Sequence, residues 1–350
     1  MSTLDTQFAP RRRALLARDP VLPTSRRARR APAGLALAAL ALAALALSAV
    51  PGLALAQEAA AADEAGSDEV LERRIITIDS SGGTQSGNLR FGPIRYEHPD
   101  PDGIVANVST LTIRSPLAEL RGPEDTLLSQ ARGQREADFD GGVTVSRGRL
   151  VATGERLAYS EATGLGVLLG GATVVIAPAE EGEDEVVITA QQVTFDVDTD
   201  ISISEGRVLL VNANQTAASE RLLFEEARDL GQLTSEDGRA VVTRAGDDGE
   251  VMTIEADEIR VLTDLKALYA IGAVEVIDGP ITSRGEVVFY DDDDEVAEVI
   301  GSPAVSVDEA AGVRLETDRI RQDVRFRFIE AIDATVPTSY SAEQFALTGE

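Results

Sequence analysis

The sequence contains no cysteine and a single histidine, and both scarcities exclude kinds of chemistry. Without cysteine, the chain can form neither a disulfide nor a thiolate metal site, and it cannot carry a lipoprotein anchor. The one histidine, His98, stands between Tyr96 and the prolines Pro99 and Pro101, which indicates a turn. With no second histidine, a catalytic triad or a zinc site is hard to build. We therefore expect no enzyme, no catalytic residue, no metal site and no cofactor.

Long apolar runs are also scarce, and the one present lies near the N-terminus. Residues 33–50 are apolar, eight arginines precede them, and the small-x-small pattern Ala54-Leu55-Ala56 follows. This order is typical of a secretory signal peptide, which we place at residues 1–56 and assign to Sec-type export. The run of 18 residues is also within the ~17–25 that can span a bilayer. We expect a periplasmic protein, or one anchored in the inner membrane if the signal is not cleaved.

Basic residues are few relative to acidic ones, and the formal net charge is −28. Residues 1–56 hold eight of the 32 basic residues and two of the 60 acidic ones, so the remaining 294 residues carry a net charge of −34. A charge this negative argues against nucleic acids and anionic membrane surfaces as direct partners.

Beyond the signal, no window has the periodicity of a convincing amphipathic helix. Residues 57–70 are mainly Ala, Glu, Asp, Gly and Ser, and we expect a disordered acidic linker. From residue 71 to 335, apolar and polar residues alternate with a period of two and are interrupted by Gly, Asp and Pro, which predicts half-buried strands. These strands form one continuous region or two modules of about 71–180 and 186–335, followed by a tail at 336–350.

A degenerate repeat runs through the strand region. Each copy has a small residue, two polar residues, a branched apolar anchor, one variable residue and then, in most copies, an aromatic or apolar residue, as in Ala190-Gln-Gln-Val193-Thr-Phe195. Six anchors recur at spacings of 36, 29, 37, 29 and 32 residues, which indicates a stacked repeat architecture. They are Leu157, Val193, Leu222, Ile259, Val288 and Ile320.

Thirteen residues after the anchor, four of the copies place a glycine. These are Gly170, Gly206, Gly272 and Gly301; the third copy has Gly238 later, and the sixth has Asp333. Glycine supplies the positive φ of a tight turn, so we predict a strand-to-strand turn at each of these positions.

Side chains of a strand alternate between its two faces, so an anchor and the residue two positions later share a face. The anchors and these partners, together with apolar residues of the returning strands, predict an apolar groove. The candidate groove residues are Leu157, Tyr159, Val193, Phe195, Ile201, Ile203, Leu222, Phe224, Ile259, Val261, Leu268, Val274, Val276, Val288 and Tyr290. Val167, Val296 and Val305 are expected on the same face. These aromatic and aliphatic side chains either contact acyl chains or fill a closed core.

The repeat resembles that of the OstA-like proteins. The segments that carry the resemblance are Ile188–Phe195, Ile254–Ile259 and Asp140–Val145 ahead of Arg149–Ala152. That family includes the lipopolysaccharide-transport bridge protein LptA, LptC and the N-terminal domain of LptD. The resemblance, over roughly Leu71 to Asp333, implies a V-shaped β-jellyroll whose apolar groove shelters acyl chains. It also implies end-to-end stacking on LptC-like or LptD-like jellyrolls, or self-association, through edge strands.

The resemblance thus implies binding of lipopolysaccharide or a related envelope glycolipid and its transport to the outer membrane during outer-membrane assembly. Because lipopolysaccharide is anionic, the charge of the chain favours the broader expectation of an amphipathic lipid. Two alternatives stay open at this point. One is a structural or adhesive β-solenoid of the cell surface without cargo, and the other is a carbohydrate-active enzyme on a β-helix.

Two acidic runs, Asp291–Glu295 and Glu180–Glu185, invite a metal-binding interpretation. Neither has the spaced ligands and turn glycine of a calcium loop. The first lies where the repeat predicts a hairpin tip, so we expect a solvated turn there.

Overall fold

A computed structural model describes residues 70–179, 184–246, 249–333 and 335–350. These residues lie within one compact unit, Ala54–Glu350. The predicted signal peptide (1–56) and the predicted linker up to residue 69 lie outside the described residues. No helix of the described part is long and apolar enough to cross a membrane.

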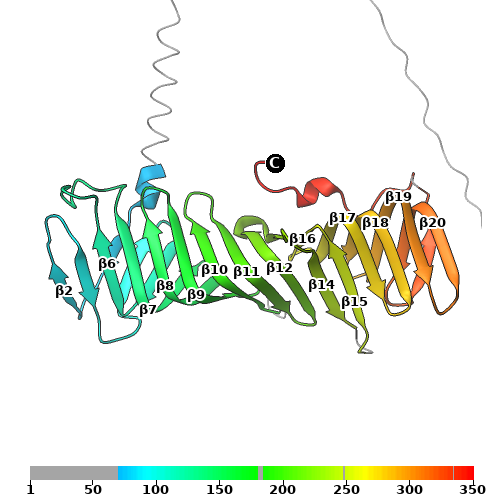
Figure 1. Cartoon of the computed structure of the whole chain (residues 1–350), viewed down its shortest axis with the longest axis horizontal. Helices are drawn as coiled ribbons and strands as arrows, with labels where there is room; N and C mark the ends of the chain where they lie inside the picture. Colours follow the sequence, from blue (N-terminus) through cyan, green and yellow to red (C-terminus); the bar gives the residue numbers. More distant parts are fainter. Residues whose placement is uncertain (1–69, 180–183, 247–248, 334) are drawn as a thin grey trace, which may run out of the picture. The chain divides into compact units, whose positions relative to one another are not determined.

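The described chain forms a β-jellyroll of 21 strands joined in one antiparallel sheet (Figure 1). The predicted all-β class is confirmed. Ten of the strands are long, with 11–13 residues each. They are β7 (Glu136–Arg147), β8 (Leu150–Ser160), β9 (Leu165–Ile176), β10 (Val186–Asp196), β11 (Ile201–Asn212), β12 (Gln215–Glu225), β17 (Ala267–Asp278), β18 (Ile281–Asp291), β19 (Val296–Asp308) and β20 (Val313–Asp323).

Each long strand contributes one half to each of two walls, which we call wall 1 and wall 2. Wall 1 pairs in the order β2, β3, β6, β7–β13, β16–β21, and wall 2 in the order β1, β4, β5, β7–β12, β14, β15, β17–β20. The short strands of wall 1 are β2 (Thr84–Gly87), β3 (Ile94–Glu97), β6 (Leu117–Arg121), β13 (Leu230–Thr234), β16 (Glu258–Leu262) and β21 (Phe328–Ala331). Those of wall 2 are β1 (Thr77–Asp79), β4 (Ile104–Val108), β5 (Leu111–Ser115), β14 (Ala240–Ala245) and β15 (Val251–Ala256).

The two walls meet where the long strands bulge. The pairing register shifts in the middle of these strands, for example between Glu205 and Val208 of β11 and between Ile271 and Val274 of β17. A bulge adds one residue to a strand and bends it, so each long strand can turn from one wall into the other.

Gly170, Gly206, Gly272 and Gly301 lie in these bulges, so the strand-to-strand turns predicted at these four positions are wrong, whereas Gly238 does lie in the connection between β13 and β14. Gly170, Gly206 and Gly272 do have positive φ values of 90°, 80° and 82°, but each lies inside a long strand. Gly301 also lies inside a strand, β19. The spacing correctly located residues with positive φ. Glycine supplies positive φ in a bulge as well as in a turn, so the spacing alone does not distinguish the two.

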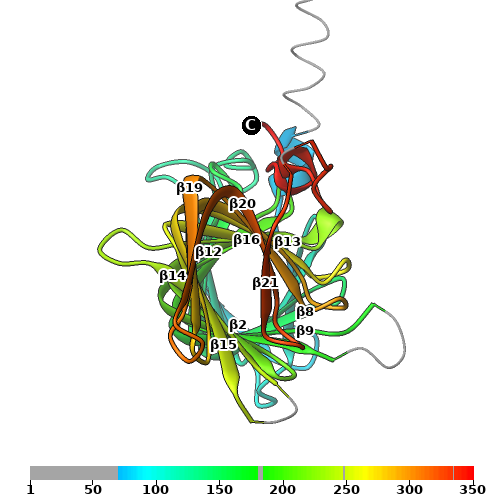
Figure 2. The same cartoon turned by 90° about the vertical axis from the view of Figure 1, so that its right-hand side faces the viewer.

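Between the walls lies the main hydrophobic core. The six repeat anchors are buried in it, with exposed fractions of 0–1%. Figure 2 looks along the succession of strands, with β14 on one side and β21 on the other. The strand ends opposite the bulges form a margin where the loops of wall 1 approach the loops of wall 2. We call this margin the seam.

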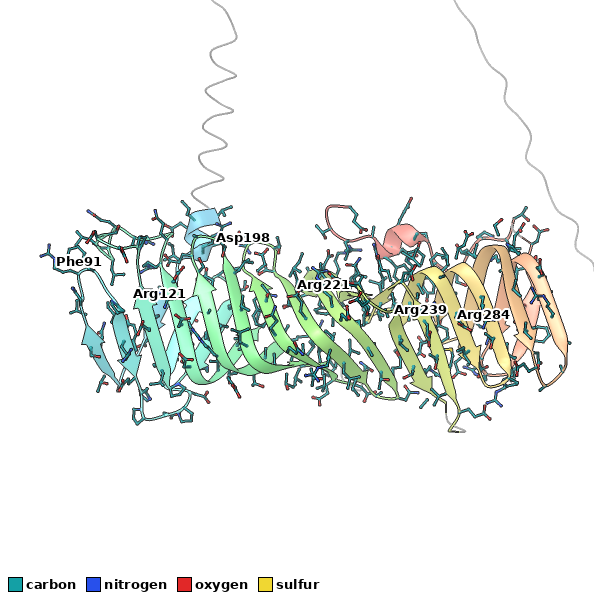
Figure 3. All side chains as sticks on the ribbon, in the orientation of Figure 1. Phe91, Arg121, Asp198, Arg221, Arg239 and Arg284 are labelled. Atoms are coloured by element: carbon teal, nitrogen blue, oxygen red, sulfur yellow. The ribbon has the colours of Figure 1, made fainter. Side chains whose placement is uncertain are left out.

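The outer surface is rich in paired charges. Arg121 bonds Glu136 and Asp138, Arg239 bonds Glu255, and Arg284 bonds Glu275. Figure 3 shows these three arginines along the sheet.

The C-terminal residues cover one apolar part of this outer surface. Phe345, in the 3-10 helix η2 (Ala342–Phe345), is fully buried against Tyr269 and Phe289 of wall 1. Glu350 accepts hydrogen bonds from Arg260 at 2.6 and 2.8 Å. Residues 339–350 of the predicted tail therefore pack on β16–β18.

Candidate functional site

The inner face of wall 1 carries two parallel rows of side chains, one through the anchors and one through the residues two positions later. The pairing register places Leu157 opposite Leu168, which in turn lies opposite Val193. In the second row, Phe224 lies opposite Gly231, which lies opposite Val261. The period of two in the sequence thus corresponds to two rows that run through every repeat.

Wall 2 faces these rows with a row of its own. Val174, Ile188, Leu210, Ala217 and Val242 follow one another across neighbouring strands. The row continues to Ile254 and Val276, and these two side chains are completely buried. The core is therefore made of two apolar surfaces, each contributed by one half of every long strand.

The structure brings most of the candidate groove residues together. Thirteen of the fifteen line the interior, and Val261, the least buried of them, packs against the main core. They are Leu157, Tyr159, Val193, Phe195, Leu222, Phe224, Ile259, Val261, Leu268, Val274, Val276, Val288 and Tyr290.

Ile201 and Ile203 do not face the interior, and their predicted placement is corrected. Phe195 and Val193 of β10 pair with Ser202 and Ser204 of β11, and both serines are buried, with exposed fractions of 5% and 4%. Ile201 and Ile203 therefore project to the outer face of wall 1. The same alternation places Val167, Val296 and Val305 on outer faces. Alternation alone defines two faces; the pairing with the neighbouring strand decides which of them is inner.

In the middle of the sheet, the two walls enclose a cavity of about 620 Å³. Wall 1 lines it with apolar side chains that include Leu222, Phe224 and Leu268, and wall 2 lines it with Val242 and Met252, among others. Small residues such as Gly231 of wall 1 and Ala217 of wall 2 leave room between the larger side chains. A cavity of this size is typical of sites for small molecules.

The cavity reaches the seam, where its lining becomes polar. We call this part the mouth. From wall 2 it includes Asn212, Asn214 and Gln215, and from wall 1 Thr263 and Asp264. Along the inner row nearest the seam, the side chains change from Ile176 and Val186 to Asn212 and Gln215. The site thus combines an apolar interior with a hydrogen-bonding entrance.

Ion pairs connect the two walls on either side of the mouth. Arg149 of wall 2 donates to Asp229 of wall 1 on one side. On the other side, Arg244 of wall 2 contacts Asp292 and donates to Glu295 at 3.0 Å, both in the β18–β19 loop of wall 1. Asp292 and Glu295 lie in the hairpin tip that the repeat predicted. We expected solvated carboxylates there, but both of these pair with Arg244.

Tyr290 lines the cavity and is buried. Burial raises the pKa of Tyr290, so the phenol is protonated at neutral pH and donates to Asp292 at 3.3 Å. Among the described residues, no group of three or more acidic or histidine side chains is arranged to hold a metal ion. His98 lies in the connection between β3 and β4, as predicted, and its Nδ1 accepts a hydrogen bond from the Asp100 backbone.

Packed side chains fill the interior towards β8, and a buried polar cluster fills part of it towards β20. Towards β8 it is filled by completely buried side chains such as Leu168 and Phe195. Towards β20, Ser283 of wall 2 donates to Gln322 of wall 1 at 2.7 Å, and both are completely buried. Ser306 joins the same polar cluster at 2.8 Å. The cavity reaches the surface at the mouth, and near Arg244 and Met252 it adjoins a second cavity of about 330 Å³.

The sequence did not single out the mouth residues or Met252. Asn212 follows Leu210 in β11, and Gln215 precedes Ala217 in β12, each two positions away on the same face, and this switch from apolar to polar was the available signal. The ion pairs had no such signal, because Arg149 and Asp229 are 80 residues apart.

No family model matches the chain, and no curated protein matches it. Among solved structures, it is similar to LptH from Pseudomonas aeruginosa, described as the LptA-homologous periplasmic component of the lipopolysaccharide transport device. The identity is 13% and the TM-score 0.31, over 33% of this chain and 82% of that one.

Proposed function

We propose that this protein binds an amphipathic lipid and carries it across the periplasm, with the acyl part between the walls and the head group at the mouth. The observation that carries the proposal is the cavity of about 620 Å³, apolar inside and polar where it reaches the seam. This polarity matches that of an amphiphile.

The energetics favour acyl chains as the cargo. Each methylene transferred from water to an apolar site contributes about 0.8 kcal/mol, so a dozen methylenes contribute on the order of 10 kcal/mol before the cost of association. No bond has to form or break for this function.

The ends of the sheet support contact with other proteins of the same kind. Among the described strands, β2 pairs only with β3 at one end of wall 1, and β21 pairs only with β20 at the other. Unpaired edges accept further strands. Exposed aromatic side chains lie beside both edges, with Phe91 42% exposed near β2 and Phe328 54% exposed in β21. Other jellyrolls of a transport bridge, LptC-like or LptD-like, or further copies of this chain would extend the sheet there. Such a bridge would deliver lipid to the outer membrane.

A pair of neighbouring substitutions tests the proposal. Ala217 lines the cavity and is 4% exposed, whereas Ala218, the next residue of β12, is exposed on the outer face. We expect the unmodified protein to bind a monoacylglycerol that carries a fluorophore on its acyl chain. Ala217→Phe should fill the cavity and weaken this binding at least tenfold, while Ala218→Phe should not change it.

Thermal unfolding of both variants shows whether the fold is intact. Absence of probe binding by the unmodified protein, together with absence of lipid in native mass spectra after gentle purification, would contradict the proposal. Equal binding by the Ala217→Phe variant would show that the lipid is held elsewhere.

A further inference from the structure

The charges of the mouth bear on which head group the cavity accepts. Three cationic side chains line it, Arg149, Arg244 and Lys266. Six carboxylates surround them, four in the lining (Asp184, Asp229, Asp264 and Asp292) and two as partners of the cations (Asp293 and Glu295). Glu295 also pairs with Arg325, so six carboxylates stand against four cations. The mouth therefore has an excess of negative charge, like the chain as a whole, whose net charge is −28.

Each of the three cations is already bound to a carboxylate. Arg149 bonds Asp229 and also donates to the carbonyl of Ala177 at 2.8 Å. Lys266 donates to Asp293 at 3.0 Å.

Arg244, the third cation, lies between two acidic side chains, Asp292 and Glu295. An anionic head group at the mouth would have to displace one of these carboxylates or remain beside it, and like charges at close range repel.

Uncharged hydrogen-bonding groups are available in the same place. The side chains of Asn212 and Gln215 are half-buried and lie opposite each other in the β11–β12 hairpin. Within the described part of the chain, neither amide makes a side-chain hydrogen bond. Each amide offers donors and an acceptor, which suit hydroxyl and amide groups.

We propose that the cavity takes an amphiphile with one or two acyl chains and an uncharged head group that carries hydroxyl or amide groups. This inference rests on the proposed lipid binding and names the class of lipid. The limit on acyl chains follows from the volume of about 620 Å³, which is within the range of sites for single small ligands.

Competition between lipids that share the same acyl chains tests the head group alone. The probe is the fluorescent monoacylglycerol, and the competitors are a dioleoyl galactosylglycerol and dioleoyl phosphatidylglycerol. We expect the neutral glycolipid to displace the probe at a concentration at least tenfold lower. If phosphatidylglycerol displaces it equally well or better, the inference is overturned while lipid binding stands. If the probe itself does not bind, the proposed function fails as well.

Removing one carboxylate from the mouth should shift this preference. Asp229→Asn leaves Arg149 with a neutral partner, so phosphatidylglycerol should compete about fivefold better with this variant. Glu316→Gln is the matched control, because Glu316 is an exposed carboxylate on the outer face that also pairs with an arginine, Arg314. The control should leave the preference unchanged. No shift in Asp229→Asn, or an equal shift in both variants, would overturn the assignment of head-group selection to the mouth.

Discussion

Arg147 donates two hydrogen bonds to one oxygen of Glu226, at 2.8 Å from Nε and 2.6 Å from Nη2. Arg147 ends β7 in wall 2, and Glu226 begins the 3-10 helix η1 (Glu226–Arg228), which follows β12 in wall 1. The guanidinium is only 4% exposed and lies 5.9 Å from the ring centre of Phe195. This pair closes the seam beside the cavity.

We expect Arg147→Met to destabilise the fold by about 3 kcal/mol, because it leaves the half-buried carboxylate of Glu226 without its cation. The free energy of unfolding in urea measures the effect. In the double variant with Glu226→Gln no unpaired charge remains, so much of the loss should be recovered. A single variant as stable as the unmodified protein would show that the pair does not hold the seam.

The pH dependence of this loss has a definite sign. Burial raises the pKa of Glu226 above its ordinary value of 4.5, and the hydrogen bond from Arg147 opposes the rise. The pKa of Glu226 is thus higher in the folded protein than in the unfolded chain. Between these two pKa values the folded protein binds more protons than the unfolded chain, so stability falls as the pH rises. Removing Arg147 raises the pKa of Glu226 further, because the hydrogen bond that opposes the rise is lost. The stability difference between Arg147→Met and the unmodified protein should therefore shrink as the pH is lowered from 7 towards 4.5, and a constant difference would contradict this.

A second prediction concerns two neighbouring glycines in the bulge of β9. Gly170 and Gly171 both have positive φ, 90° and 84°. A Cβ on Gly170 would lie 2.6 Å from the Cβ of Glu155, whereas a Cβ on Gly171 would meet nothing within 4 Å. Gly171→Ala should cost about 1–2 kcal/mol from backbone strain alone. Gly170→Ala should cost roughly 1–3 kcal/mol more because of the clash. Equal unfolding free energies for the two variants would contradict the contact with Glu155.

How much the sequence could predict is clear from the anchors and from β11. Val193 and Ile259 are completely buried, as their place in the repeat predicted. Ile201 stands in a similar alternating pattern but lies on the outer face. The pairing between β10 and β11 decides which face of β11 points inward, and it places Ser202 and Ser204 there. A single strand does not contain that information.

The cavity could not be predicted for a related reason. It depends on Gly231 in one wall and Ala217 in the other, and on how far the walls stand apart between them. Packing of residues from distant strands decides this, whereas the repeat describes each strand by itself.

A third prediction concerns the route of the lipid. Asn214 and Asp264 line the mouth from opposite walls, and the chain has no native cysteine. Asn214→Cys and Asp264→Cys in one molecule, joined by a short bismaleimide, should tie the walls together. We expect uptake and release of the fluorescent monoacylglycerol to slow at least tenfold, measured by stopped-flow fluorescence.

A cross-link within one wall is the control for this experiment. Asp264→Cys and Asp293→Cys place both thiols in neighbouring loops of wall 1, which contact each other through Lys266 and Asp293. This link should leave exchange as fast as in the same double variant without the bismaleimide. If the link between the walls has as little effect, the lipid does not pass through the mouth.

The last prediction concerns the C-terminal segment. Phe345 packs against Tyr269, Phe289 and Tyr340, and Phe→Ala changes at buried positions cost about 3–5 kcal/mol. The segment adds no strand to the sheet, so we expect Phe345→Ala to release residues 339–350 while the walls stay folded. Release would expose the apolar patch on β17 and β18. Faster proteolysis of the C-terminus and increased binding of the dye ANS would report it, with little change in the main unfolding transition.

Phe326→Ala is the control, because Phe326 is 75% exposed and its loss should change none of these signals. A large drop in the main unfolding transition of Phe345→Ala would mean that the segment and the walls unfold together. In that case the segment would be an integral part of wall 1. Retention of the normal cleavage rate would instead show that the hydrogen bonds donated by the Arg228 guanidinium to the carbonyls of Gln344 and Ala346 suffice to hold it. The two outcomes distinguish apolar packing from hydrogen bonding as the main source of attachment, because Phe345→Ala removes the ring and leaves those carbonyls in place.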